Sequence, residues 1–335
     1  HLWRFHKRRR LFAVANGFAT RPSEFSPHCA TKVLWSFEEQ RVSSPALFDA
    51  FARDIVGRID REETFSVDAL TGIITSFAKS GVRAPALYDA VARRACATVD
   101  AAGAREIEDT SEMVGTRSLV GLAWSYAIAG VASEPLFDMV ASTVPPPTTL
   151  NDVQKSQLHQ VALFVEHEAP HLPQPLSSAD DRALCKESYV QNATIRYSAS
   201  QNDVSSVLRK SLHWAHESEF VTDEGISLDM ASPEERFAVE FDGPSHFATT
   251  AEGAFVPNGR TLFKQRVLQA TGWDLFAVPW YEYRDIPYAK RADFLRAGME
   301  RMRTRNRRAT DASRSARDGG AARRRVASFL PPAGG

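Results

Sequence analysis

Three acidic residues in the C-terminal half of the chain have the types and spacing that suit metal-ion chemistry. Glu240 and Asp242 are two residues apart in a segment, 237–242, that we expect to be a strand, so both carboxylates should point to one face. Asp229 lies on the preceding expected strand, residues 226–230. Three convergent carboxylates can bind Mg²⁺ or Mn²⁺ through oxygen ligands, and we predict these residues as catalytic residues and metal ligands.

These acids also have a structural interpretation. Their carboxylates could instead accept hydrogen bonds from backbone amides or pair with Lys264 and Arg266 on the following expected helix. His246 ends the turn Asp-Gly-Pro-Ser-His, where it would donate a proton or orient a phosphate. A lone histidine in a turn is also commonly a hydrogen-bonded structural residue.

The segments around these residues read as an α/β arrangement with buried middle strands. Their order is two helices, a three-stranded meander, a helix and a last strand. The expected helices are 178–193, 200–215 and 260–270, and the expected strands are 219–221, 226–230, 237–242 and 273–280.

The N-terminal half contains three copies of one pattern, in which an aromatic residue precedes a leucine by ten positions. The pairs are Phe37 with Leu47, Phe77 with Leu87, and Tyr126 with Leu136. Each copy reads as two helices, the second opened by a proline, and the copies are 40 and 49 residues apart, with an acidic insertion at 105–112. This pattern predicts a helix-pair solenoid; the alternative is an irregular helical bundle. We expect Phe48, Tyr88 and Phe137 in its core.

Four regions follow from these patterns. We expect a helical array with a terminal cap helix at 1–168, a proline-rich linker at 169–177, and a C-terminal domain at 178–300 with its core at about 219–298. Residues 301–335 are expected to form a disordered basic tail.

Charge is unevenly distributed, although 41 basic and 41 acidic residues cancel over the whole chain. Residues 301–325 hold ten arginines and two aspartates, which suits phosphate neutralisation and counterion release. The alternative is a tail that only aids solubility. The arginines predicted to contact RNA here are Arg301, Arg303, Arg305, Arg307 and Arg308.

Composition excludes several classes of protein. The sequence has no run of about 18 apolar residues, so we expect a soluble protein without a membrane span. Its three cysteines are far apart and form no CxxC pair, which argues against a disulfide scaffold or a thiolate zinc site. Because the sequence opens at His1 rather than Met, we expect a fragment or processed product, so the absence of a targeting peptide carries no information.

Three sequence words in the C-terminal half are specific. They are Ala-Val-Glu-Phe-Asp-Gly-Pro-Ser-His at 238–246, Leu-Phe-Lys-Gln-Arg-Val-Leu at 262–268, and the run from Gly-Trp-Asp-Leu-Phe to Tyr-Glu-Tyr at 272–283. They resemble the RAP domain over about residues 237–298. The upstream repeats, 28–215, resemble those of FAST kinase-like and octotricopeptide-repeat proteins. The RAP fold is in turn similar to the PD-(D/E)XK nuclease core of the very-short-patch-repair type.

The resemblance implies site residues position by position. Asp229 falls where the nuclease core has its first acid, and Glu240 falls where it has the acid of the E-x-K word. Asp242 occupies the place of the lysine, which Lys264 or Arg266 would have to replace from the side. Near the last strand, Tyr281, Tyr283 and Arg284 form an expected exposed end that would contact bases, whereas Trp273 is expected in the core.

The resemblance also implies a class of function. We expect an organellar RNA-binding protein, with a helix-pair solenoid followed by a restriction-endonuclease-like α/β RAP domain (fold class α + α/β). It would act on mRNA or rRNA in RNA processing, stability, translation or ribosome assembly, in mitochondria or alternatively in chloroplasts or other plastids. The alternatives are a metal-dependent endoribonuclease that trims organellar transcripts and a structural protein bound to the ribosome.

Overall fold

The computed structural model describes residues 2–103, 115–192 and 198–304. A helical N-terminal region precedes a small sheet domain, as the expected α plus α/β class requires. Packing divides the chain into two compact units. The first comprises the described residues within His1–Arg196, Val221–Ser227 and Asp242–Thr271, and the second comprises those within Tyr197–Phe220, Leu228–Phe241 and Gly272–Gly335.

The helices of the first unit form antiparallel pairs after a first helix, α1 (Leu2–Ala19). The first helices of the pairs are α2 (Pro27–Glu39), α4 (Val67–Ser80), α6 (Thr116–Ala129) and α8 (Asp152–His167). The second helices are α3 (Pro45–Asp60), α5 (Pro85–Gly103), α7 (Glu134–Thr143) and α9 (Ala179–Asn192). The acidic insertion at 105–112 lies outside the described residues. All the predicted repeat helices are present in the part of the chain that the structure describes.

One aromatic contact recurs from each pair to the next. The aromatic residue of each second helix meets the aromatic residue of the following first helix: Phe48 with Phe77, Tyr88 with Tyr126, and Phe137 with Phe164, at centroid distances of 5.0, 5.0 and 5.9 Å. All of these rings are buried, which confirms the repeat interpretation and the three predicted core aromatics. Because Phe164 lies on α8, the helix expected to cap the array continues its packing pattern.

Small residues let successive first helices approach closely. A Cβ on Gly72 would lie 2.4 Å from Thr31 Cγ2, and a Cβ on Gly121 would lie 3.0 Å from Thr71 Cγ2. The Thr71 hydroxyl also donates to Ser118 O across the same interface, at 3.1 Å. The first helices are therefore held together by close backbone approach and hydroxyl bonds as well as by apolar packing.

The first helices of the three predicted repeats end in the same way. Gly81 after α4 and Gly130 after α6 have φ of +69°, and the next residue donates back to the helix, as in a Schellman motif. At the equivalent place after α2 stands Arg41, with φ of +52°. A side chain in the left-handed region costs about 1 kcal/mol or more relative to glycine. Arg41 is therefore a departure from the repeat that local backbone preference does not explain.

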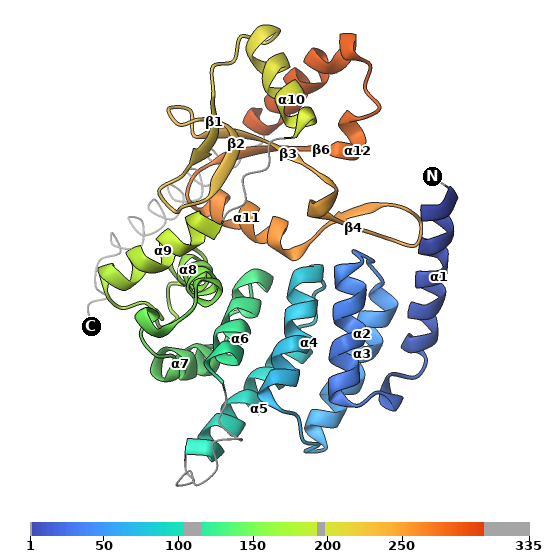
Figure 1. Ribbon diagram of the computed structural model, residues 1–335, viewed down its shortest axis with the longest axis vertical. Helices are drawn as coiled ribbons and strands as arrows, with labels where there is room; N and C mark the ends of the chain where they lie inside the picture. The colour runs from blue at the N-terminus through green and yellow to red at the C-terminus, as the bar shows by residue number, and fades with distance from the viewer. Residues whose placement is uncertain (1, 104–114, 193–197, 305–335) are drawn as a thin grey trace, which may run out of the picture. The chain divides into compact units, whose positions relative to one another are not determined.

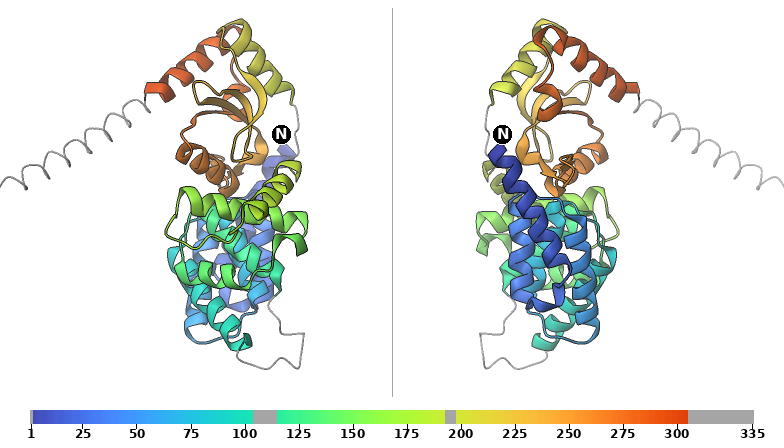
Figure 2. Two further views of the ribbon diagram at one scale, coloured as in Figure 1. Left: turned by 90° about the vertical axis from the view of Figure 1, so that its left-hand side faces the viewer. Right: turned by 90° about the vertical axis from the view of Figure 1, so that its right-hand side faces the viewer.

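A hairpin and a helix from the C-terminal half pack on these helix ends (Figures 1 and 2). The hairpin strands β4 (Phe247–Thr249) and β5 (Phe255–Pro257) precede α11 (Gly259–Ala270). Thr249 N donates to Arg41 O at 2.8 Å and Ser43 N donates to Thr249 O at 2.9 Å, so β4 bonds to the loop after α2. Helix α11 contacts α4, α6 and α8. No strand was predicted at 247–257, so the hairpin is a feature that the structure adds.

The second unit is built on a sheet of order β1–β2–β3–β6. The elements are α10 (Ala199–Lys210), β1 (Glu217–Val221), β2 (Ser227–Ser232), β3 (Phe237–Asp242), β6 (Asp274–Pro279), α12 (Trp280–Tyr283) and a helix at 288–304. Strands β2 and β3 are antiparallel, with Met230 opposite Val239. Helix α10 and the 288–304 helix cover the apolar face of the sheet (Figure 2).

Several predicted element ends in this unit differ from the observed ones: β1 begins at Glu217 and β2 ends at Ser232, each two residues beyond the predicted end. The helix expected to reach residue 215 ends at Lys210, since the chain leaves helical geometry before His213, whose φ is +52°. The strand expected to reach Trp280 ends at Pro279, which lacks the N–H that a ladder needs and occupies the N-cap position of α12 instead.

None of the helices in the described residues has an apolar stretch of the length that a membrane span needs.

Candidate nucleic-acid interface

Two of the predicted metal ligands accept backbone hydrogen bonds between neighbouring strands. Glu240, on β3, is 4% exposed, and its Oε1 accepts from Asp229 N at 2.9 Å. In return, Asp229 Oδ2 accepts from Phe241 N at 2.8 Å. These are the backbone-capping bonds of the structural alternative, and they engage one oxygen of each carboxylate.

Asp242 and His246 form a second local pair. Asp242 is 5% exposed, and its Oδ1 lies 3.1 Å from His246 Nδ1. Thr261 Oγ1 lies 3.3 Å from the same ring nitrogen, and the His246 carbonyl accepts from Asn258 N at 2.9 Å. His246 thus ties the turn after β3 to the start of α11.

The side chains present do not make a complete metal site. In 2–103, 115–192 and 198–304, no group of three or more His, Cys, Asp or Glu side chains is placed to hold a metal ion. The catalytic and metal-binding roles of Asp229, Glu240 and Asp242 stay predictions.

The predicted cations on α11 have different surroundings. Arg266 Nε donates to Glu168 Oε2 at 2.7 Å, and its Nη2 donates to the carbonyls of Ala127 and Ile128 at 2.9 and 3.1 Å. The guanidinium thereby caps the C-terminus of α6, where carbonyls lack helical partners. Lys264 is half-buried on the same helix.

The expected exposed end after β6 is only partly exposed. Tyr283 is 3% exposed and its hydroxyl donates to Asp203 Oδ2 at 2.6 Å, so the predicted exposure of this residue is wrong. The ring anchors α12 in the apolar core of the second unit. Arg284 is exposed, pairs with Asp285 at 2.8 Å and lies over the Trp280 ring.

The remaining predicted RNA contacts are distributed as follows. Tyr281 is half-buried, and Trp273 is 5% exposed, as a core residue should be. Arg301 is exposed, whereas Arg303 pairs with Glu235 and lies over the Phe237 ring. Arg305, Arg307 and Arg308 lie outside the described residues.

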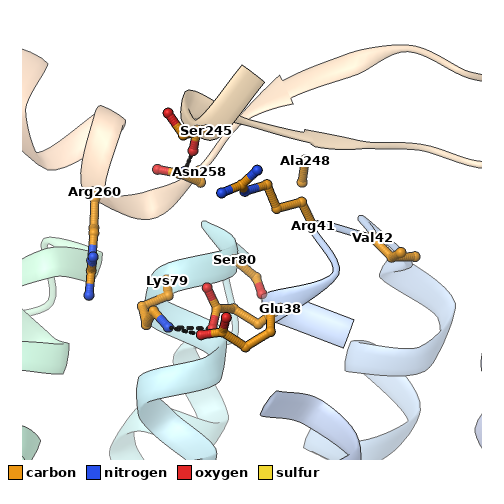
Figure 3. A pocket seen from close by; sticks show the side chains of 10 residues that line it. Glu38, Arg41, Val42, Lys79, Ser80, Ser245, Ala248, Asn258 and Arg260 are labelled. Atoms are coloured by element: carbon orange, nitrogen blue, oxygen red, sulfur yellow. Dashed lines mark hydrogen bonds and ion pairs between the residues drawn. The ribbon is translucent and has the colours of Figure 1, made fainter. Parts of the chain in front are cut away.

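A cavity of about 230 Å³ that the sequence analysis missed lies where the hairpin and α11 meet the repeats (Figure 3). It is lined by the last two residues of α2, Glu38 and Glu39, by the loop that follows them, by the end of α4, by residues at and before β4, and by the N-terminus of α11. They include three cations and one buried hydroxyl: Arg41, Lys79, Arg260 and Ser80. Figure 3 shows the Arg41 side chain reaching toward Asn258.

The three cations are not equivalent. Lys79 donates to Glu38 and, at 3.3 Å, to Glu39, so its ammonium group is engaged by two carboxylates that also line the cavity. Arg260 lies over the Trp124 ring, 5.5 Å from its centroid. In the part of the chain that the structure describes, neither Arg41 nor Arg260 has a carboxylate at ion-pair distance. Two exposed guanidinium groups therefore remain beside the first turn of α11, whose amides also favour an anion.

One sequence signal could have identified Arg41. Aligning the repeats places it opposite Gly81 and Gly130, so an arginine stands where the other repeats have the residue that a left-handed turn prefers. Arg260 carried no such signal, because its partner Trp124 is distant in sequence.

Comparison with known proteins shows what the C-terminal half of the chain is similar to. The family model for the RAP domain matches residues 239–297. A protein of Oryza sativa subsp. japonica named "RAP domain-containing protein, chloroplastic" is 29% identical over 182 residues. That match covers 51% of this chain and 28% of the rice protein, so it spans little more than a quarter of the relative's length. Residues 239–297 of this chain, which include the β4–β5 hairpin and α11, are a RAP domain.

Proposed function

We propose that the protein binds single-stranded RNA on the face of the first unit where the RAP hairpin and α11 meet the ends of the repeat helices. The observation that carries the proposal is the cavity in which Arg41, from the repeats, and Arg260, from the RAP domain, both lack a carboxylate partner within the described residues. Guanidinium groups and helix N-terminal amides are the donors that bind phosphodiester oxygens. The RAP domain, a module linked to RNA binding, supports the same ligand.

The proposed setting is an organelle. The rice relative is named as chloroplastic, which supports an organellar location for this chain, and we keep both plastid and mitochondrion as the proposed compartment. In that setting the protein would act in the processing, stability or translation of transcripts, or in ribosome assembly. The RNA contacts of Tyr281, Arg284 and Arg301, which lie in the second unit, stay a separate prediction that this site does not require.

Arg41→Gly separates RNA binding from folding. The variant removes one guanidinium and restores the residue that the equivalent turns carry, so the free energy of unfolding should stay unchanged or rise by about 1 kcal/mol. RNA affinity should fall, and the slope of log affinity against log salt should flatten by about 0.7 if one phosphate contact is lost. Fluorescence anisotropy with labelled single-stranded RNA over a salt series measures both quantities.

Arg53→Ala is the matched control, because Arg53 is an exposed arginine on α3 that does not line the cavity. Equal affinities and equal salt slopes for Arg41→Gly and the unaltered protein would refute the proposed interface.

RNA recovered intact after incubation with Mg²⁺ or Mn²⁺ is the expected result, whereas cleavage would favour the endoribonuclease alternative.

A further inference from the structure

A second, larger cavity of about 540 Å³ lies in the first unit beside the α4–α11 contact. The loops after α4 and α6 and one side of α11 enclose it. Its apolar wall includes Phe77, Ile128 and Leu262. Its volume lies within the range of small-ligand sites.

Glycines keep the cavity open. Gly81 and Gly130 line it with left-handed backbones. A Cβ at Gly81 would lie 3.3 Å from Leu262 Cδ1, and one at Gly130 would lie 3.2 Å from the Arg266 guanidinium carbon. The same helix ends that set the repeat geometry therefore leave room for a ligand next to α11.

Two lining residues carry polar atoms without a partner among the described residues. Tyr88 is 1% exposed, and its buried hydroxyl makes no hydrogen bond although its ring packs on Tyr126. Burial raises the pKa of Tyr88 well above its usual range, so the hydroxyl stays protonated. Glu168 uses Oε2 to accept from Arg266, while its buried Oε1 is unpartnered. An unpaired buried polar atom is unfavourable, and a ligand that supplies a donor and an acceptor would satisfy both.

The chemistry of the walls narrows the class of ligand. A planar, mostly apolar body with donors and acceptors on its edge matches the apolar wall and the two unpaired atoms. The side-chain amides of Gln265 and Gln269 offer further hydrogen bonds at the rim. The cavity with Arg41 and Arg260 shares the end of α4 with this one, since Lys79 and Ser80 line that cavity while Ala78 and Gly81 line this one.

We propose that this cavity binds an unstacked purine base of the RNA whose phosphodiester backbone passes Arg41 and Arg260. The bicyclic purine offers a larger apolar face than a pyrimidine for the wall that Phe77, Ile128 and Leu262 form, and its amino or ring N–H group would donate to Glu168 Oε1. This inference rests on the proposed RNA binding and adds base selectivity to it.

Tyr88→Phe tests the inference because it removes only the unpaired hydroxyl. The probes are labelled oligouridine and the same strand with one central adenosine or guanosine. The unaltered chain should bind the purine-containing strands about fivefold to tenfold more tightly, as one or two added hydrogen bonds allow. Tyr88→Phe should lose most of that preference, with unchanged or higher thermal stability, because it removes a buried unpaired hydroxyl, and with unchanged affinity for oligouridine.

Two further variants control the experiment. Tyr288→Phe removes the hydroxyl of a tyrosine that is 73% exposed, and it should change nothing. Val131→Trp narrows the cavity from the loop after α6 and should remove the purine preference by a different route.

The outcomes separate the two proposals. Absence of binding to every strand would overturn the proposed function and this inference with it. Binding without a purine preference, or a preference that survives Tyr88→Phe, would overturn the inference alone. A preference lost together with thermal stability in Tyr88→Phe would give the hydroxyl a structural role and would also overturn the inference.

Discussion

Replacing Gly259 by alanine is expected to lower the free energy of unfolding by about 3 to 5 kcal/mol, the range of severe core overpacking and backbone displacement. A Cβ at this position would lie 1.7 Å from Ala78 O, so α11 cannot keep its place at the end of α4. The neighbouring atom belongs to the backbone and has no rotamer that relieves the clash. Urea denaturation followed by far-ultraviolet circular dichroism measures the change.

Gly243→Ala is the matched control for this substitution. Gly243 has a φ of −71°, and no atom lies within 4 Å of a Cβ built on it, so its stability should change by less than about 0.5 kcal/mol. Equal stabilities of the two variants would contradict the docking of α11 on the repeat helices.

Leu87→Asp is expected to destabilise the helical array by about 4 kcal/mol or more, since it places an unpaired carboxylate in an apolar interior. Leu87 is 1% exposed and occupies the leucine position of the second repeat, beside Tyr88. The loss should appear as a lower urea midpoint and as a lower thermal transition.

Ala86→Asp provides the comparison one residue away. Ala86 is exposed in the first turn of α5, where an acidic side chain is favourable, so its stability should stay within about 0.5 kcal/mol of the unaltered chain. A tolerated Leu87→Asp would mean that the leucine positions of the repeats do not face a shared core.

The repeats were predictable because their signals are local. The aromatic-to-leucine spacing places Phe77 and Leu87 on facing helices of one pair, and each proline sets a helix start within a few residues. The alternation in β3 was predictable for the same reason, with Phe237 and Val239 in the core and Glu240 on the other face. In both cases the regular spacing of apolar residues along the sequence is enough to predict the element and the face that it buries.

The hairpin and the docking of α11 were not predictable in this way. Strand β4 bonds to residues 41–43, about two hundred positions earlier, and no local pattern specifies such a partner. Strands β4 and β5 are each three residues long, which is too short for an alternation of apolar and polar residues to be recognised in the sequence. The packing that brings 242–271 together with the repeats is therefore a property of tertiary contacts.

The candidate site was predictable only for residues whose side-chain type and local backbone pattern indicate the same role. The acids Asp229 and Glu240 were found, but their backbone hydrogen bonds depend on strand register. Tyr283 was expected at the surface because it follows a strand end, yet α12 turns its ring into the core. Arg41 was overlooked because its importance depends on a backbone angle and on distant neighbours.

Photo-crosslinking of 4-thiouridine RNA to the whole chain, with the attached peptides identified by mass spectrometry, tests the central claim most directly. We expect crosslinks to the peptides that carry Arg41, Lys79 and Arg260, and we expect Arg41→Gly to weaken them while Arg53→Ala does not. Crosslinks confined to the 288–304 helix and the residues after it, with none to these three peptides, would contradict an RNA interface at the junction of the repeats and the RAP domain.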